Sequence, residues 1–153
     1  RRGIFARYQS NNLIPGHVYT LWWVIWNNPQ ECEIPGACND PDFETPGEVG
    51  VDVLYAGSGP VVGENGKGTF YALLRAGDVS ETINDLFELP PAGGLQVGNT
   101  FNSEVHLVLR SHGPAIPGMI DEQMGSYIGG CIDPFAIAPF TETPEEAGEC
   151  GDI

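Results

Sequence analysis

The most apolar run of the chain is "YTLWWVIW", residues 19–26, in which apolar side chains occupy both faces of a predicted strand. Successive side chains of a strand point to opposite faces, so Trp23 lies on one face while Trp22, Val24 and Trp26 lie on the other. Only one face of a strand contacts the core of a two-layer domain. The second face must therefore be covered by another segment of the chain, by a partner or by a ligand.

Alternating apolar and polar residues, the pattern of half-buried strands, recur along the chain. Asn65-Gly66 before one of these runs predicts a tight hairpin, and Pro134 and Pro139 predict an edge position for the last run. The predicted strands are "GIFARYQS" (3–10), "EVGVDVLYA" (48–56), "KGTFYALLRAG" (67–77), "SEVHLVLRS" (103–111) and "PFAIAPF" (134–140).

Two runs depart from strand alternation and predict short helical turns. In "DVSETINDLFEL", Ser80 is an expected N-cap, and Ile83, Leu86 and Phe87 follow at helical spacing. A second turn is expected in "DEQMGSY", where Gly125 ends it. The patterns together predict one all-β domain over residues 1–153, an antiparallel β-sandwich that is Ig-like or jelly-roll-like, with one or two short helical turns.

The charge of the chain restricts its partners. The formal net charge is −15, from 21 acidic and 6 basic residues, whereas binding to nucleic acid relies on lysine and arginine. No nucleic-acid partner is therefore expected. No apolar run approaches the roughly 20 residues that cross a bilayer, so no membrane span is expected either.

The cysteines favour an oxidising compartment. Cys32 and Cys38 flank a Pro-Gly turn, and Cys131 and Cys150 flank a proline-rich segment. Of the three possible pairings, Cys32–Cys38 with Cys131–Cys150 closes the smallest loops and ties down an acidic C-terminal segment, about 131–153. The alternatives are four buried thiols or a zinc site, which would need paired C-x-x-C motifs.

Two segments, "HVYTLWWVIWNNPQEC" and "EVHLVLRSHGPAIPGMIDEQMGSYIGGC", resemble an uncharacterised group of secreted bacterial β-rich proteins. In that group a strand that ends in an Asn-Asn-Pro turn and a cysteine is followed by a Glu-Val-His strand and a Ser-His-Gly-Pro turn. The resemblance implies an exported domain, extracellular or at the cell surface, and implies no activity.

Two sets of residues are candidate metal ligands. Asp40, Asp42 and Glu44 lie within "CNDPDFET", and close carboxylates in a loop are usual ligands of calcium. His106 shares a predicted strand face with Glu104, and imidazole beside carboxylate suits zinc or copper. The alternatives are a solvated acidic loop and a histidine that hydrogen-bonds across the sheet. Without an EF-hand or a spaced zinc motif, no cofactor is expected, although the acidic loop offers ligands for calcium.

The sequence contains no pattern that predicts catalysis. Ser111 precedes His112, but the chain lacks the G-x-S-x-G motif of a nucleophile elbow. With 21 acidic residues, a pair of neighbouring carboxylates arises by chance. We therefore expect a protein that is not an enzyme.

The face that carries Trp22, Val24 and Trp26 has three interpretations. A loop or helical turn of the same chain covers it, it forms a platform for sugar rings, or it is a protein interface. Because an exposed apolar row promotes association, we expect a secreted or cell-surface structural protein that self-associates, such as a subunit of an extracellular fibre or coat. The alternative is an extracellular module that binds carbohydrate or a divalent metal.

Overall fold

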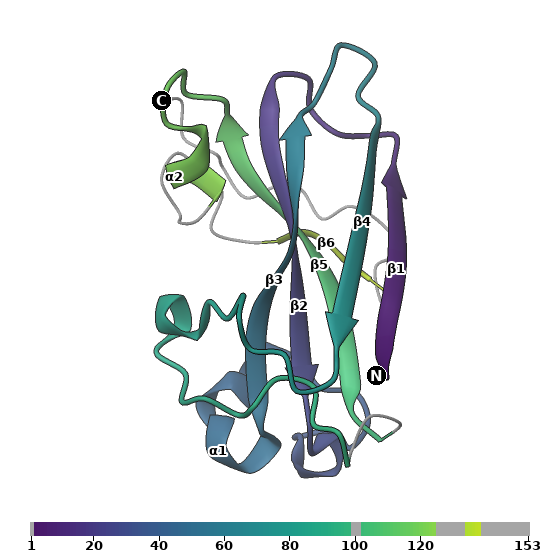
Figure 1. Cartoon of the computed structure of the whole chain (residues 1–153), viewed down its shortest axis with the longest axis vertical. Coiled ribbons are helices and arrows are strands. Elements are labelled where there is room, and N and C mark those ends of the chain that lie inside the picture. The colour runs from purple at the N-terminus through teal and green to yellow at the C-terminus, as the bar shows by residue number, and fades with distance from the viewer. Residues whose placement is uncertain (1, 99–101, 125–133, 139–153) are drawn as a thin grey trace. The chain divides into compact units, whose positions relative to one another are not determined.

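The structure is a computed structural model that describes residues 2–98, 102–124 and 134–138; at 58–60, 122–123 and 134–138 only the backbone is described. The strands form two antiparallel sheets, one in the order β1-β4 and one in the order β3-β2-β5-β6 (Figure 1). The predicted fold class, an all-β antiparallel sandwich, is confirmed. The strands are β1 (Gly3–Ser10), β2 (His17–Trp26), β3 (Val51–Val61), β4 (Gly68–Arg75), β5 (Glu104–Pro114) and β6 (Pro134–Ala138).

The helical segments are all short. Both predicted turns are present, as η3 (Asn84–Phe87) and α2 (Ile120–Met124). The N-cap of η3 is Ile83 and not Ser80, whose hydroxyl instead donates to Asp78 Oδ1 over 2.7 Å. Within the described ranges, no helix is long and apolar enough to cross a membrane. The sequence patterns did not predict η1 (Pro29–Glu31), η2 (Asp40–Glu44) or α1 (Pro46–Val49).

The chain divides into two compact units, each built from three separate segments. Unit 1 comprises Arg1–Phe5, Trp23–Tyr55 and Leu73–His106, and unit 2 comprises Ala6–Trp22, Ala56–Ala72 and Leu107–Ile153. Each unit has its own buried apolar residues. In unit 1 these include Trp23, Ile25, Val49, Val51, Val53, Leu74, Leu89 and Leu95, and in unit 2 Leu13, Val18, Tyr19, Leu21, Val62, Phe70, Ala72, Leu107 and Leu109. The single domain expected over residues 1–153 stays a prediction.

Strand β2 is buried on both faces. Its first residue, His17, is half-buried, and each of the other residues is buried. β2 lies between β3 and β5, and β5 is likewise buried from His106 to Gly113. A strand with covered faces reads as a continuous apolar run, which explains the sequence "VYTLWWVIW".

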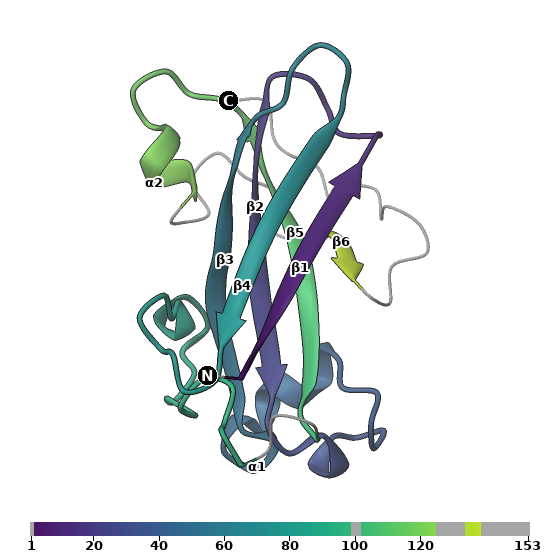
Figure 2. The same cartoon turned by 45° about the vertical axis from the view of Figure 1, so that its right-hand side comes forward.

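Strands β1 and β4 run side by side in Figures 1 and 2 and form the two-stranded sheet. Side chains along β4 alternate strictly between buried and exposed, as expected for a strand with one face toward the core. The exposed positions of β4 nevertheless include Tyr71, 60% exposed, and Leu73, 53% exposed. Phe5 on β1 is 68% exposed. The outward positions of these two strands therefore carry large apolar side chains.

The predicted hairpin at Asn65-Gly66 is wrong. The turn joins β3 to β4, and these strands belong to different sheets. Gly66 has the expected positive φ of 63°, but Asn65 is not among the non-glycine residues with positive φ. A type I′ turn needs positive φ at both central residues. Asn65 Oδ1 instead accepts the Lys67 N–H over 3.0 Å, which closes a local side-chain turn.

The last strand, β6, occupies an edge of the four-stranded sheet, as its prolines predict. It pairs antiparallel with β5 from Leu107 opposite Ala138 to Leu109 opposite Ala136. The register shifts between Leu109 and Arg110, and Arg110 then lies opposite Pro134, which has no N–H to donate. Pro139 lies outside the described residues.

Candidate functional site

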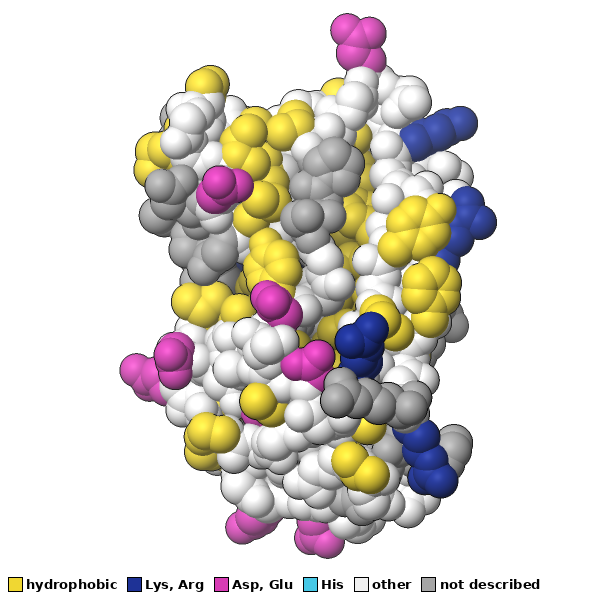
Figure 3. Space-filling view, in the orientation of Figure 1, with side chains coloured by type: hydrophobic (Ala, Val, Ile, Leu, Met, Phe, Trp, Pro, Cys, Tyr) yellow, Lys and Arg dark blue, Asp and Glu magenta, His cyan; other side chains and the backbone are white. Residues whose placement is uncertain are grey.

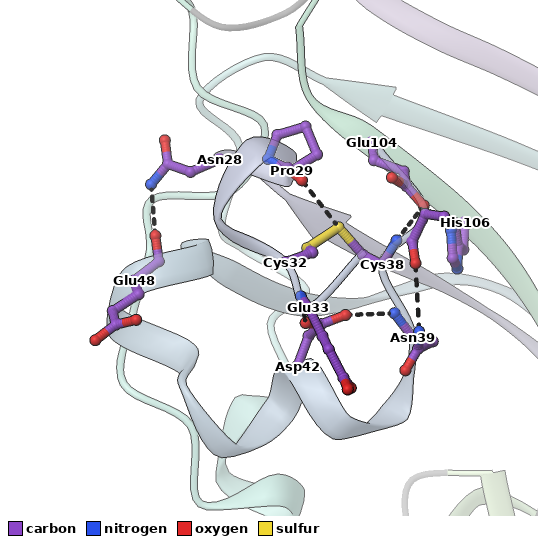
Figure 4. The surroundings of a disulfide bond; sticks show 11 residues. Asn28, Pro29, Cys32, Glu33, Cys38, Asn39, Asp42, Glu48, Glu104 and His106 are labelled. Carbon is purple, nitrogen blue, oxygen red and sulfur yellow. Dashed lines mark hydrogen bonds and ion pairs between the residues drawn. A yellow bond between two sulfur atoms is a disulfide. The ribbon is translucent and has the colours of Figure 1, made fainter. Parts of the chain in front are cut away.

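The disulfide predicted between Cys32 and Cys38 is confirmed, and both residues are buried. The bond closes a loop of sequence separation 6 that follows η1 (Figure 4). From within the loop, the Gly36 N–H donates to the carbonyl of Pro29, the first residue of η1, over 2.9 Å. The loop is thus held by a covalent bond and by a backbone hydrogen bond. The predicted bond between Cys131 and Cys150, with the acidic segment around it, lies outside the described residues.

Asp42 fastens this loop to the segment that follows it. Its Oδ1 accepts the Glu33 N–H and its Oδ2 accepts the Asn39 N–H, each over 2.7 Å (Figure 4). The side chain is buried, with 3% exposed. Both carboxylate oxygens therefore bind backbone groups of the chain, and Asp42 acts as a structural acceptor at the start of η2.

The structure does not bring the predicted metal ligands Asp40, Asp42, Glu44 and His106 into one group. Asp40 and Glu44 are exposed, whereas Asp42 and His106 are buried. Over the described ranges, the ligand atoms close enough to share an ion belong to Cys32, Cys38 and Asp42. The two sulfur atoms are joined in the disulfide, and a metal site needs thiolates. The described geometry therefore gives no support to the calcium hypothesis.

Glu104 and His106 form a pair beside the disulfide loop (Figure 4). Glu104 Oε1 accepts the Cys38 N–H over 3.0 Å and lies 2.7 Å from His106 Nε2. The imidazole packs edge-to-face on Trp26, with 4.4 Å between ring centroids. The pair joins the start of β5 to the disulfide loop and to β2, so a positional role follows from the geometry.

Burial decides the charge of His106. Desolvation lowers the pKa of His106 below its usual 6.5, although the Glu104 carboxylate and Asp40 act in the opposite direction. The short contact to Glu104 would by itself suggest an ion pair. Desolvation outweighs the attraction to Glu104, so His106 is neutral near pH 7. Its Nε2–H then donates to the Glu104 carboxylate. Among these groups we find a hydrogen-bonded neutral histidine.

The expected interface or ligand platform of Trp22, Val24 and Trp26 is not exposed. Their exposed fractions are 4%, 6% and 2%, because other segments of the chain cover this face of β2. Phe43 of η2 lies edge-on to Trp26 at 5.8 Å, and Phe87 of η3 stacks on Phe43 at 6.0 Å. The helical turn η2 thus packs on Trp26, and η3 packs on η2. Cover by a loop or helical turn of the same chain was one of the three interpretations of the sequence.

In unit 2 the same face of β2 meets polar side chains of β5. The Arg110 guanidinium lies 5.7 Å from the centroid of the Trp22 ring, and the His112 ring is edge-on to it at 6.3 Å. Thr20 Oγ1 and His112 Nε2 are hydrogen-bonded at 2.7 Å, and both residues are buried. His112 therefore binds a threonine of the neighbouring strand. The buried Ser111, its neighbour in sequence, accepts a hydrogen bond from the Gly113 N–H over 3.4 Å.

A buried carboxylate on β3 was not predicted from the sequence. Asp52 is 2% exposed and accepts hydrogen bonds from Asn84 Nδ2 (2.6 Å) and from the N–H groups of Ala92 (2.9 Å) and Gly94. Gly94 has φ +66°, and a side chain there would clash with the Asp78 carbonyl oxygen. Alternation alone places Asp52 on the polar face of its strand. The one feature of the sequence that could have indicated its burial is its position within the apolar run "VDV".

Asn27 organises the same loop from the end of β2. Its Nδ2 donates to the carbonyls of Gly94 (2.8 Å) and Gly50 (3.2 Å). Its Oδ1 accepts from the Gln96 N–H (3.0 Å) and the Ser103 hydroxyl (3.2 Å). One buried amide therefore satisfies four groups from three segments. The polar clusters of unit 1 are structural, and they fix loops around a buried strand.

Side chains available to a partner lie instead on the outward face of β1 and β4. In unit 2, the Arg7 guanidinium lies over the Tyr71 ring, 6.0 Å from its centroid. Next to this pair, Gln9 Nε2 donates to Thr69 Oγ1 over 3.2 Å. These four side chains are exposed. Figure 3 shows Lys and Arg side chains over β1 and β4, beside exposed apolar groups.

Comparison of the chain with protein-family models, with curated proteins and with solved structures finds no match. The resemblance to secreted bacterial proteins stays a prediction. The class that the fold defines is a two-sheet antiparallel β-protein with a disulfide-closed loop.

Proposed function

We propose that the protein is an exported structural module, without enzymatic activity, that self-associates through the outward face of β1 and β4. The observation that carries this proposal is the pattern of β4. Tyr71 and Leu73 project outward between the buried Phe70, Ala72 and Leu74. Isolated exposed apolar residues are ordinary, but aromatic and aliphatic side chains at successive outward positions of one strand are typical of an interaction surface.

The disulfide supports export of the protein. The Cys32–Cys38 bond is buried, and it closes a loop that Asp42 also fastens. Disulfides of this structural kind persist in secreted and cell-surface proteins and are rare in the cytosol. An extracellular or cell-surface location is consistent with this bond.

The buried polar groups support a structural role over a catalytic one. Glu104–His106 binds the disulfide loop, Thr20–His112 joins two strands, and Asp52 holds a loop. A general base must reach a proton of the substrate, directly or through one water. In each case the named hydrogen bonds join groups of the same chain, and the residues are buried or nearly so.

A second function, carbohydrate binding, draws on one observation. Tyr71 offers a ring face, and Arg7, Gln9 and Thr69 offer polar groups around it. Sugar sites combine an aromatic surface with a few placed hydrogen-bonding groups. Glycan-array binding that disappears in Tyr71→Ser, by a protein that stays monomeric, would establish this alternative in place of assembly.

The test of assembly is sedimentation velocity over a wide range of protein concentration. We expect the weight-average mass to rise with concentration for the wild type and to stay at the monomer value for Tyr71→Ser. Val97→Ser is the matched control, because Val97 is 63% exposed and lies outside the strands. A wild type that stays monomeric at every concentration and salt level would disprove the proposed function.

A further inference from the structure

In the part of the chain that the structure describes, exposed positive charge is concentrated at β1 and β4. Of the 6 lysine and arginine residues, Arg110 is buried. The others lie within these two strands or just before them in the sequence: Arg1, Arg2, Arg7, Lys67 and Arg75. Residues 8–66 contain no lysine or arginine. An interaction surface with this charge, on a chain of net charge −15, selects an acidic occupant.

The disulfide loop has the complementary surface. Glu31, Glu33 and Ile34 are exposed, and Ile34 exposes 58% of its surface between the two cysteines. The loop thus presents an aliphatic side chain beside carboxylates, whereas the strand face presents Tyr71 beside Arg7. An aliphatic group packs on the aromatic ring while the carboxylates meet the guanidinium.

The loop is also preorganised for binding. The disulfide, the Gly36–Pro29 hydrogen bond and the Asp42 carboxylate on the Glu33 N–H fix its backbone. A loop that is already fixed loses little conformational entropy when it binds, so its contacts contribute more fully to affinity. The role of the buried Asp42 and Glu104 is to hold this loop.

Charge also determines the symmetry of the contact. If two copies met through the same face, Arg7 and Lys67 of one copy would approach those of the other, and like charges oppose such contact. A contact between two different surfaces avoids this repulsion. Because each copy carries one of each surface, the contact can be repeated from copy to copy.

Resting on the proposed self-association, we infer that the disulfide loop and the preceding Glu31 of one copy bind the face around Arg7 and Tyr71 of a second copy, a head-to-tail contact that can repeat from copy to copy.

The test uses two variants that each remove one surface. The face variant carries Arg7→Glu and Tyr71→Ser, and the loop variant carries Glu33→Arg and Ile34→Ser. We expect each variant alone to associate at least about tenfold more weakly than the wild type, because like charges now meet across the contact. An equimolar mixture should recover association, because the intact loop of the face variant binds the intact face of the loop variant and the reversed charges at positions 7 and 33 attract each other.

Controls separate this inference from the proposed function. Glu81→Arg and Val97→Ser change an exposed charge and an exposed apolar residue elsewhere, and should associate like the wild type. Circular dichroism and melting temperature check that each variant is folded; the single changes Arg7→Glu and Glu33→Arg replace any double variant that is not. Rising salt should narrow the difference between the wild type and the two variants, because screening reduces both the attraction across the wild-type contact and the repulsion that the variants introduce.

The outcomes distinguish the two proposals. If the wild type stays monomeric, the proposed function fails, and this inference fails with it. If the wild type associates but the loop variant does so equally well, or the mixed variants stay monomeric, the head-to-tail contact is wrong and self-association stands. A difference between the wild type and the variants that does not shrink with salt would likewise contradict a charge-complementary contact.

Discussion

Strands β2 and β4 carry apolar side chains on both faces, yet only β2 is buried on both. β2 lies between β3 and β5, and loops of the chain cover the face that carries Trp26. β4 belongs to the two-stranded sheet and exposes Tyr71 and Leu73. The more apolar strand is therefore the interior one, and the exposed apolar face lies on a strand of ordinary composition. The elements that pack on a strand, and not how apolar the strand is, decide which apolar face stays available.

The largest expected effect contrasts these two strands directly. Trp26→Ala removes a ring that packs on His106 and Phe43, and should lower the free energy of unfolding by about 3–5 kcal/mol. Tyr71→Ser should change the stability of the monomer by less than about 0.5 kcal/mol, because Tyr71 is mainly exposed. Urea denaturation of both variants checks the contrast. Equal losses would mean that β4, too, is covered.

The next effect contrasts a buried with an exposed carboxylate. Asp52→Ala leaves the N–H groups of Ala92 and Gly94 without their acceptor and should cost about 2–4 kcal/mol. Glu44→Ala, at an exposed position, should fall within about 0.5 kcal/mol of the wild type. Amide exchange gives a local readout, because Ala92 and Gly94 should lose protection first. Unchanged protection at both residues would contradict the assigned role of Asp52.

The third effect concerns the disulfide loop. Replacing Cys32 and Cys38 by serine removes a constraint on the unfolded chain, and for so short a loop the chain-entropy model gives about 2 kcal/mol. The N–H groups of Glu33 and Asn39, which Asp42 binds, should exchange faster. Ser10→Ala, at a half-buried position outside the loop, is the control. Wild-type stability in the double serine variant would show that hydrogen bonds alone hold the loop.

Local patterns predicted the strands because alternation is a property of neighbouring residues. The predicted strand at residues 3–10 matches β1, and the prolines placed β6 at an edge. Pairing could not be predicted in the same way: Asn65-Gly66 resembles a hairpin, but β4 pairs with β1, far away in the sequence. Burial of Asp52 also depends on a distant loop, residues 84–94. The disulfide was predictable, because its two cysteines are close in sequence.

The smallest effect is the pH dependence of the histidine beside β2. Burial lowers the pKa of His106, so the folded state binds this proton less readily than the unfolded chain, where the value is about 6.5. The stability that a neutral His106 provides is thus fully present above about pH 6.5 and declines as the pH falls through that value toward the folded pKa. Burial also lowers the pKa of His17, with the same sign.

Unfolding followed between about pH 8 and 5, above the usual range of carboxylates, should show that stability falls as the solution becomes more acidic. His106→Gln should flatten that slope more than His17→Gln, because His106 is buried and His17 only half-buried. A slope that is unchanged in His106→Gln would show that folding leaves the pKa of His106 unshifted, and a steeper slope would show that the folded imidazole is charged and paired with Glu104.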